Sequence, residues 1–285
     1  MQTLLEILKK TEGFFAGKKL ENPRLQAELL LAAALHCKRL ELYLQFERLM
    51  SEETLARLRD WVRRRAAREP FQYITGETDF RSLTLKCDPR ALIPRPETEE
   101  LAGLVLDALP ASGPVRAADL GTGTGAIALS LASERPEMQV VATDRSEKAL
   151  ALARENAQKL GLEARITFVT GNWMHGIEGG FDAIVSNPPY LTEEELATAA
   201  PEVAQHEPRE ALVAQDDGLS DLKTILAQAK AHLLPGGFVA LETGIAHADA
   251  LAAHAESLGY AHHESRKDMS GRDRFFLARI ERSDP

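Results

Sequence analysis

The chain has 285 residues, of which 44% are hydrophobic and 27% are charged, an ordinary composition for a water-soluble globular protein. This length is enough for two domains, one of them large. The 34 lysines and arginines against 43 aspartates and glutamates give a formal net charge of -9. That balance provides no general attraction to nucleic acid or to an anionic membrane, so neither is expected as a direct partner.

The remaining composition excludes several kinds of site. Cys37 and Cys87 form neither a disulfide framework nor a metal cluster, and we expect reduced thiols. None of the eight histidines pairs at metal-ligand spacing with a cysteine or carboxylate, so no metal site is expected. The N-terminus lacks a signal-peptide pattern, and no stretch reaches the roughly 20 apolar residues that span a bilayer. These features predict a cytoplasmic protein, with a frayed tail over the last five residues.

Residues 1–72 carry leucines and alanines at helical spacing, which predicts a small helical bundle. Asn22-Pro23 is typical of a helix start, with the asparagine as cap and the proline in the first position. Ser51 resembles a second helix entry. The helix after it carries six arginines, Arg57, Arg59, Arg63, Arg64, Arg65 and Arg68. We interpret them as a solvated face, and the alternative is a binding surface for an acidic partner.

Residues 73–96 differ in pattern from both neighbouring regions. Residues 78–85 alternate like a short hairpin, and the prolines within Leu92–Glu97 predict an extended backbone. We expect this segment to connect two domains and to form part of a cleft wall.

From residue 97 to residue 285, strand-like and helix-like segments alternate. The predicted strands are 115–120, 139–143, 166–169, 181–185, 238–241, 260–265 and 275–280, and helices such as 126–132 and 218–234 lie between them. Alternation at these lengths predicts an α/β domain with a mostly parallel sheet and helices on both faces.

A glycine-rich loop follows the first predicted strand and opens a helix; it consists of Gly121, Thr122, Gly123, Thr124 and Gly125. Glycines there let a ligand approach the backbone, and the helix N-terminus offers unpaired N–H groups. Asp144 ends the second strand at the same edge, where a carboxylate can accept hydrogen bonds from both ribose hydroxyls. The alternative for Asp144 is a cap on the following helix. Loop and acid together predict a nucleoside-containing cofactor, without distinguishing NAD from S-adenosylmethionine.

Asn172-Trp173 follows the third predicted strand at the same edge of the sheet. There the indole of Trp173 can form a wall against an adenine ring. The alternative is a tryptophan that belongs only to the core.

The tetrapeptide Asn187-Pro188-Pro189-Tyr190 follows the fourth predicted strand, also at this edge. The prolines have fixed φ and no N–H, so the backbone is stiff and its carbonyls are free as acceptors. Carbonyl groups of Asn187 and Pro188 can together hold both hydrogens of a substrate NH₂, and Tyr190 can lie flat against a planar amide or base. The alternative is a proline turn that merely closes a strand.

Such an arrangement suits methyl transfer to a planar nitrogen. The lone pair of an amide nitrogen is delocalised into the carbonyl, which makes the nitrogen a poor nucleophile. Acceptors on both N–H groups favour localising that lone pair toward a sulfonium methyl, and they orient the nitrogen as well. The tetrapeptide therefore predicts a methyltransferase that acts on an amide or amino nitrogen.

Four segments together resemble the HemK/PrmC family of release factor glutamine N5-methyltransferases, which have the Rossmann-like class I methyltransferase fold. These are LIPRPETE (Leu92–Glu99), DLGTGTGAIAL (Asp119–Leu129), VSNPPY (Val185–Tyr190) and KDMSGRDRF (Lys267–Phe275). The similarity covers most of residues 73–280, and a helical N-terminal part is also a feature of the family. NPPY alone is shared with DNA and RNA amino methyltransferases, whereas its combination with the other segments is more specific.

The resemblance implies an enzyme that uses S-adenosylmethionine, with S-adenosylhomocysteine as product, to methylate the Gly-Gly-Gln glutamine of peptide chain release factors. Residues 1–72 would recognise that substrate, and residues 97–285 would form the methyltransferase domain. The implied cofactor contacts are Gly121 to Gly125, Asp144, Trp173 and Asn187. The implied catalytic and substrate-binding residues are Asn187, Pro188, Pro189 and Tyr190.

Some features stay open at this stage. The family pattern leads us to expect an acidic or serine residue before Trp173, so the partner of the adenine amino group is not assigned. No role is assigned to Arg95, Glu97 and Glu99 near the cleft, or to Glu202, Glu207 and Glu210 in the loop after the tetrapeptide, although that loop can orient substrate. The alternative functions are methylation of an RNA or DNA base, which the arginine-rich helix keeps open, and a non-catalytic module that binds a nucleoside cofactor.

Overall fold

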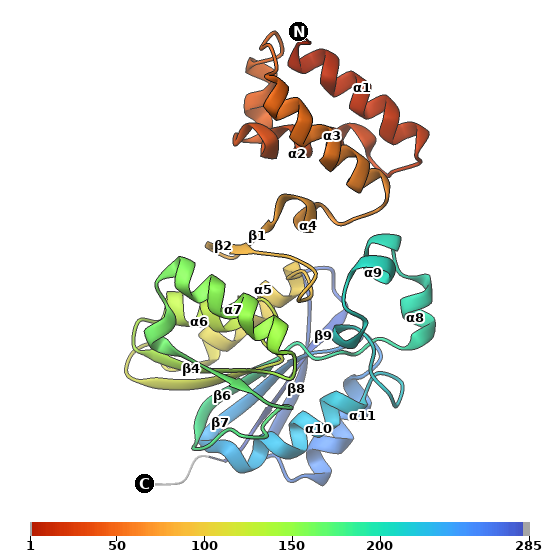
Figure 1. Ribbon diagram of the computed structural model, residues 1–285. Coiled ribbons are helices and arrows are strands. Elements are labelled where there is room, and N and C mark those ends of the chain that lie inside the picture. The colour runs from red at the N-terminus through yellow and green to blue at the C-terminus, as the bar shows by residue number, and fades with distance from the viewer. Residues whose placement is uncertain (1, 282–285) are drawn as a thin grey trace. The chain divides into compact units, whose positions relative to one another are not determined.

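The computed structural model describes residues 2–281, so the predicted frayed tail lies outside the described residues except for Glu281. The chain divides into two compact units (Figure 1). The first, here called the helical unit, comprises Met1–Gly76 and Pro201–His206, and the second, the sheet unit, comprises Glu77–Ala200 and Glu207–Pro285. No helix within residues 2–281 has the length and apolar content needed to cross a membrane.

The helical unit confirms the helical character predicted for the N-terminal region. Its elements are α1 (Leu4–Gly17), α2 (Pro23–Leu35), the 3-10 helix η1 (Arg39–Leu44), α3 (Glu52–Ala66), α4 (Phe71–Thr75) and α9 (Pro201–His206). The Ser51 hydroxyl accepts a hydrogen bond from the Thr54 N–H at 3.2 Å, which confirms the predicted entry to α3. Leu8, Phe15 and Leu30 are fully buried in the core that the helices share.

The predicted capping role of Asn22 is wrong. Asn22 has a left-handed backbone, with φ 47°, and its side chain makes no cap hydrogen bond. Asparagine tolerates this conformation, and the turn it makes delivers Pro23 to the first position of α2. Only the proline half of the predicted helix start is therefore confirmed.

The six arginines of α3 and its C-terminal end are only partly a solvated face. Arg65 is buried and donates to the Gln26 side chain at 3.0 Å and to Glu202 of α9 at 2.7 Å. The others also have partners within the helical unit: Arg57 with the Ala34 carbonyl, Arg59 with Glu52, Arg63 with Asp60, Arg64 with Glu69, and Arg68 with Glu202. Because carboxylates already pair with most of these guanidinium groups, the face has little free positive charge.

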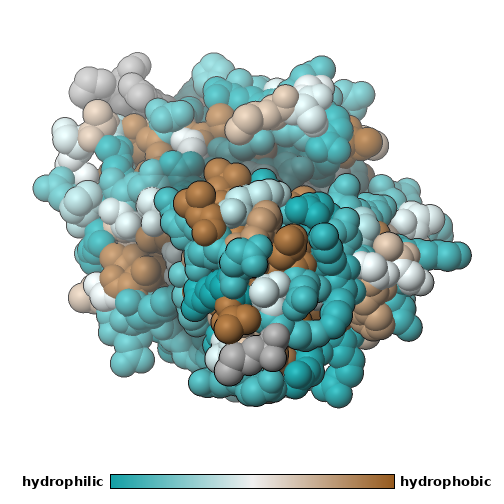
Figure 2. Space-filling view, turned by 90° about the horizontal axis from the view of Figure 1, so that it is seen from above, coloured by the Kyte–Doolittle hydropathy of each residue, from teal (hydrophilic) through white to brown (hydrophobic). Residues whose placement is uncertain are grey.

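Several apolar side chains of the helical unit remain in contact with solvent. Leu40 and Leu44 of η1 are 72% and 87% exposed, and Leu49 is also exposed. Figure 2 shows hydrophobic residues dispersed among hydrophilic ones on the face seen from above.

The sheet unit begins with the predicted hairpin, β1 (Glu77–Phe80) and β2 (Leu83–Lys86), which pair antiparallel. The central sheet follows, with strand order β5-β4-β3-β6-β7-β9-β8. Its strands are β3 (Val115–Leu120), β4 (Met138–Asp144), β5 (Ile166–Thr170), β6 (Phe181–Ser186), β7 (Leu233–Glu242), β8 (His262–Lys267) and β9 (Asp273–Arg279). The pairs from β5 to β7 are parallel, and β9 is antiparallel to both of its neighbours. The mostly parallel sheet is thus confirmed.

Helices cover both faces of this sheet (Figure 1). On one face lie α5 (Pro96–Ala108), α6 (Ala126–Glu134) and α7 (Glu147–Leu160), and on the other lie α10 (Ser220–Ala229) and α11 (Ala248–Ser257). Successive strand residues alternate between the two cores, as Ala117 and Ala118 of β3 do. The short elements η2 (Glu163–Arg165), α8 (Glu193–Thr198), η3 (Arg209–Ala211) and η4 (Lys230–His232) complete the chain.

Three predicted boundaries are wrong. The helix expected over 218–234 ends at Ala229, and β7 starts at Leu233 rather than after the following Pro-Gly-Gly. The register between β6 and β7 shifts between the pairings of Phe181 and Ala183. The proline and the two glycines therefore lie within β7, at an irregularity of the strand. The extended backbone predicted for Leu92–Glu97 ends at Arg95, because Pro96 takes the first position of α5.

Candidate active site

The strand order reverses between β3 and β6, since the chain builds from β3 to β4 and β5 on one side and continues with β6 and β7 on the other. Ligands of open parallel sheets bind outside the carboxyl ends of the strands at such a switch point. Leu120 and Ser186 are register partners at these two strand ends. The glycine-rich loop and the NPPY tetrapeptide therefore start from adjacent positions.

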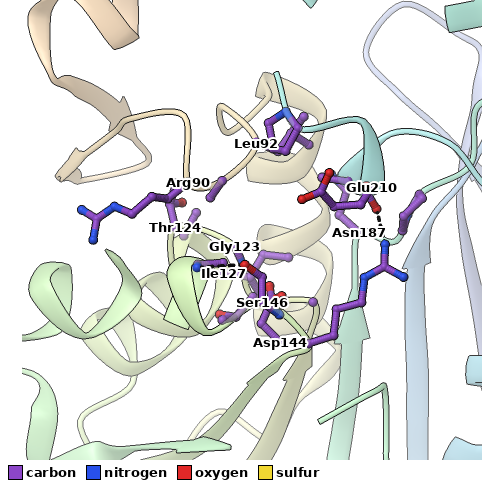
Figure 3. Close-up of a pocket in the computed structure, with 18 of the residues that line it drawn as sticks. Arg90, Leu92, Gly123, Thr124, Ile127, Asp144, Ser146, Asn187 and Glu210 are labelled. Atoms are coloured by element: carbon purple, nitrogen blue, oxygen red, sulfur yellow. Dashed lines mark hydrogen bonds between the residues drawn. The ribbon is translucent and has the colours of Figure 1, made fainter. Parts of the chain in front are cut away.

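A cavity lies at this edge of the sheet unit (Figure 3). Of the predicted site residues, it is lined by Gly121, Thr122, Gly123, Thr124, Asp144, Trp173, Asn187 and Pro189. Leu92 and Pro94, ahead of α5, and Pro208 and Glu210, after the tetrapeptide, also contribute to the lining. The predicted residues that do not line the cavity are Gly125, Pro188 and Tyr190.

The glycine-rich loop needs its glycines for backbone conformation and for space. Gly121, Gly123 and Gly125 have φ values of 72°, 56° and 85°, in the region that other residues rarely adopt. A Cβ on Gly125 would lie 2.9 Å from Leu129 Cδ1, and one on Gly121 would lie 3.2 Å from the Trp173 ring. The loop backbone is thus packed against α6 on one side and the indole on the other.

The Asp144 carboxylate is attached to this loop. Its Oδ2 accepts from the Gly123 N–H at 3.0 Å, and its Oδ1 accepts from the Ser146 N–H at 2.8 Å. The cap of α7 is Ser146, whose hydroxyl accepts from the Ala149 N–H at 3.3 Å, so the alternative role of Asp144 as cap does not hold. Burial raises the pKa of Asp144. Each carboxylate oxygen keeps a further lone pair for a ligand hydroxyl.

Asp119, the last polar residue of β3, holds the other side of the loop. Its Oδ2 accepts from the Thr122 hydroxyl at 2.6 Å and from the Ala128 N–H at 3.1 Å. Its Oδ1 is buried and has no hydrogen-bond partner within residues 2–281, and burial raises the pKa of Asp119 to about 7. Asp119 is not among the residues that line the cavity, but a buried, unsatisfied carboxylate oxygen beside the glycine loop has the chemistry to pair with a positively charged donor, such as an ammonium group.

Trp173 belongs to the core and also lines the cavity, whereas its contact with an adenine ring stays a prediction. It is 8% exposed and packs in the core on the α10 face. The same residue lines the cavity, with a left-handed φ of 54°. Asn172 also lines the cavity.

The NPPY tetrapeptide is connected to two residues that the sequence patterns did not single out. The Asn187 amide NH₂ donates to the Thr98 hydroxyl at 3.0 Å, and that hydroxyl lies 2.7 Å from Glu242 Oε2. The Tyr190 hydroxyl donates to Glu242 Oε1 at 2.9 Å. Burial raises the pKa of Glu242, and burial together with this carboxylate raises the pKa of Tyr190. One signal was present in the sequence: a glutamate ends the otherwise apolar strand FVALE at the ligand-binding edge.

Glu207 was placed in the loop after the tetrapeptide without a defined role. Its buried carboxylate accepts from the Ile93 N–H at 3.0 Å and from the Arg95 guanidinium. This contact fixes the segment whose Leu92 and Pro94 line the cavity. The LIPRP part of the sequence is therefore a wall of the site, as expected for the connector.

The remaining candidates have different surroundings. Glu97 pairs with Arg272 of the KDMSGRDRF segment at 3.4 Å, and Glu202 belongs to the helical unit. No group of three or more His, Cys, Asp or Glu side chains within residues 2–281 is arranged to hold a metal ion. Cys37 and Cys87 are free thiols, and burial raises the pKa of Cys87 to about 12, which makes it a poor nucleophile.

Comparison with known proteins assigns both parts of the chain. Residues 6–76 match the PrmC N-terminal domain, and residues 99–219 match the methyltransferase small domain. Over 276 residues the chain is 42% identical to the release factor glutamine methyltransferase of Deinococcus radiodurans, covering 97% of this chain and 98% of that protein. The protein of the same name from Geobacter sulfurreducens is 39% identical over 279 residues, covering 98% and 97%. The chain belongs to the release factor glutamine methyltransferase family. The resemblance drawn from the sequence motifs is thereby confirmed.

Solved structures confirm the class I methyltransferase fold. A methyltransferase from Pyrococcus furiosus is similar with a TM-score of 0.52 and 23% identity, covering 82% of this chain and 100% of that chain. A 16S rRNA methyltransferase of T. thermophilus, in complex with AdoMet and guanosine, gives a TM-score of 0.53 at 18% identity, covering 72% and 50%. At these identities the similarity concerns the fold alone.

Proposed function

We propose that this enzyme transfers the methyl group of S-adenosylmethionine to the side-chain amide nitrogen of the glutamine in the Gly-Gly-Gln motif of peptide chain release factors. One observation carries the proposal. The NPPY tetrapeptide stands across the switch point of the sheet from the glycine-rich loop, in a member of the release factor glutamine methyltransferase family. The bound cofactor supplies an electrophilic methyl group, and the protein supplies binding, orientation and the acceptors for the substrate N–H groups.

The cofactor side of the proposed site consists of Gly121 to Gly125, Asp144, Trp173 and Asn187. The glycine backbone permits close approach of the ligand, and Asp144 offers lone pairs to the ribose hydroxyls. The unsatisfied Oδ1 of Asp119 fits the ammonium of the methionine part. A dinucleotide cofactor has no such ammonium group, so this carboxylate favours S-adenosylmethionine over NAD.

The substrate side consists of Asn187, Pro188, Pro189 and Tyr190. The Asn187 side chain and the Pro188 carbonyl are proposed as the two acceptors for the glutamine NH₂, with the Tyr190 ring against the planar amide. Residues 1–72 are proposed to recognise the release factor. The solvent-exposed leucines of η1 support an interaction role for this part of the chain. The proposed site of action is the cytoplasm, where peptide chain release takes place.

The decisive assay incubates the purified protein with methyl-labelled S-adenosylmethionine and a release factor, either wild type or with the Gly-Gly-Gln glutamine replaced by alanine. We expect label only in the wild-type factor. Equal labelling of both factors would contradict the proposed target. Labelling that requires copurified RNA, and that nuclease abolishes, would instead support a base as substrate. The paired arginines of α3 speak against that outcome, because phosphate binding needs unpaired Lys and Arg.

A further inference from the structure

Glu242 is a buried carboxylate in the second layer around the proposed substrate site. It ends β7, which pairs with β6, the strand that leads into the tetrapeptide. The side chain is 1% exposed, and a charge at such a position must be compensated by hydrogen bonds. Each of its two oxygens accepts one hydrogen bond: Oε2 from the Thr98 hydroxyl at 2.7 Å, and Oε1 from the Tyr190 hydroxyl at 2.9 Å. The guanidinium of Arg274 lies over the Tyr190 ring, 5.8 Å from its centre.

The hydrogen bonds around Glu242 all run toward its carboxylate. The Thr98 and Tyr190 hydroxyl groups both donate to it, which is the direction that an ionised carboxylate requires, because such a group only accepts. The Thr98 oxygen then has only lone pairs left for Asn187, and it must accept there. Of the two ends of the Asn187 amide, the NH₂ end is therefore the one that faces Thr98. The carbonyl end is left for the cavity, which Asn187 lines.

This polarity matters because a substrate amide presents two N–H donors. An Asn187 amide turned by 180° would place its own NH₂ against the substrate NH₂, with two donors facing each other and no acceptor. The two orientations have almost the same shape, so packing alone does not select between them. The Thr98 oxygen does select between them. Because its own hydrogen is donated to Glu242, it can only accept from Asn187, and this favours the orientation in which the Asn187 NH₂ faces Thr98.

We infer that Glu242 acts as a positioning residue which, through the Thr98 hydroxyl, sets the amide of Asn187 so that its carbonyl oxygen faces the substrate nitrogen. Through the Tyr190 hydroxyl it also holds the ring that follows the two prolines. This inference rests on the proposed function, because it assigns the orientation of the same tetrapeptide. Neither Thr98 nor Glu242 is asked to touch the reacting atoms.

The test compares turnover of a release factor by the wild-type protein and by variants of the relay. Thr98→Val keeps the shape of the side chain but cannot accept from Asn187, and we expect its kcat to fall by about 10²-fold, the scale of losing one oriented polar contact. Thr98→Ser restores the hydroxyl and should recover most of that loss. Glu242→Gln replaces one acceptor oxygen by an NH₂ donor, so one of the two hydroxyl groups that donate to Glu242 loses its acceptor. We expect a loss of kcat similar to that of Thr98→Val. Affinity for S-adenosylhomocysteine, measured by calorimetry, should stay within about threefold of wild type in all three.

Ser130→Ala is the matched control. Ser130 is a fully buried hydroxyl in α6 of the same unit, and its oxygen has no hydrogen-bond partner within residues 2–281. Its removal should leave kcat at the wild-type value. This variant separates loss of the relay from the general effect of deleting a buried hydroxyl.

A second readout separates positioning from simple support of the fold. In an Asn187→Ala background, Thr98→Val should cause no further loss of kcat, because the relay has no amide left to orient. Additive losses, or Thr98→Val turnover within threefold of wild type, would overturn the inference. If Glu242→Gln does not fold, the Thr98 variants decide the question alone. A wild-type protein that does not methylate the release factor would instead refute the proposed function on which the inference rests.

Discussion

The two sides of the cavity are built by different means. The side after β3 and β4 is made largely of backbone: glycines with positive φ, and N–H groups that bind the Asp144 carboxylate. The side after β6 and β7 depends on side chains from distant parts of the chain, since Thr98 and Glu242 are 144 residues apart in the sequence. A backbone site is specified locally, whereas a side-chain relay exists only after the sheet and α5 have assembled. Among the variants below, Asp144→Ala is expected to affect ligand affinity on the first side and Asn187→Ala turnover on the second, and the others are expected to affect stability.

The largest loss outside Asn187 is expected at Asp144. Asp144→Ala removes the proposed acceptor for the ribose hydroxyls and should weaken binding of S-adenosylmethionine by about 10²-fold, the value of two hydrogen bonds to a charged group. At saturating cofactor, kcat should stay within about threefold of wild type. Calorimetry and steady-state kinetics measure the two quantities separately. A fall in kcat with unchanged affinity for S-adenosylmethionine would contradict the proposal that this side of the cavity binds the cofactor.

Gly125→Ala tests the backbone side through stability. The left-handed φ of Gly125 and the 2.9 Å approach of Leu129 Cδ1 leave no room for a methyl group. We expect the free energy of unfolding to fall by about 2–4 kcal/mol, from the combined cost of the backbone conformation and overpacking. Chemical denaturation measures it. Gly161→Ala is the matched control, because Gly161 also has a positive φ but nothing lies within 4 Å of its Cβ position, and it should lose less.

Glu207→Gln tests the wall formed by the LIPRP segment. The variant keeps one acceptor for the Ile93 N–H but removes the charge that pairs with Arg95. We expect a loss of about 1–2 kcal/mol in stability, since a buried acceptor is replaced by a less suitable one. Glu264→Gln is the control, because its pair with Arg266 is exposed and worth little. Equal effects in the two variants would show that the Glu207 contact does not order the wall.

The last effect is a pH dependence of stability from Asp119. Burial raises its pKa to about 7 in the folded protein, against about 3.9 in an unfolded chain. Between these values the folded state holds a proton that the unfolded state has lost, so stability falls as pH rises from about 4 to 7. The slope from this group is at most about 1.4 kcal/mol per pH unit. Asp119→Asn should remove that part of the slope in denaturation curves measured at several pH values. An unchanged slope would mean that Asp119 is ionised throughout this range.

The sequence allowed the fold and the backbone side of the site to be predicted because both depend on short-range patterns. Alternating strands and helices, the glycine loop after a strand and the acid after the next strand all lie within a few residues of the features they indicate. The same holds for Pro23 and Ser51 in the helical unit. The errors at Asn22 and at the start of β7 arose where a local conformation replaced the usual cap or turn.

The side-chain relay could not be predicted in this way. Thr98 lies in the first turn of α5, one residue after a glutamate that appeared equally suited to the cleft. The pairing of β7 with β6 brings Glu242 beside Tyr190, and the packing of α5 against β7 brings it beside Thr98. Arg65 is a similar case. Its position in a basic stretch predicts a solvated side chain, and its partner Glu202 is too distant in the sequence for a local pattern to indicate the pair.

Asn187→Ala tests the central claim most directly, because this residue lines the cavity and is the end point of the relay. The measurement is kcat for methylation of a release factor together with the affinity for S-adenosylmethionine. An amide that grips the substrate predicts a loss of about 10²-fold or more in kcat, with cofactor affinity within an order of magnitude of wild type. Turnover at the wild-type rate in this variant would contradict the account.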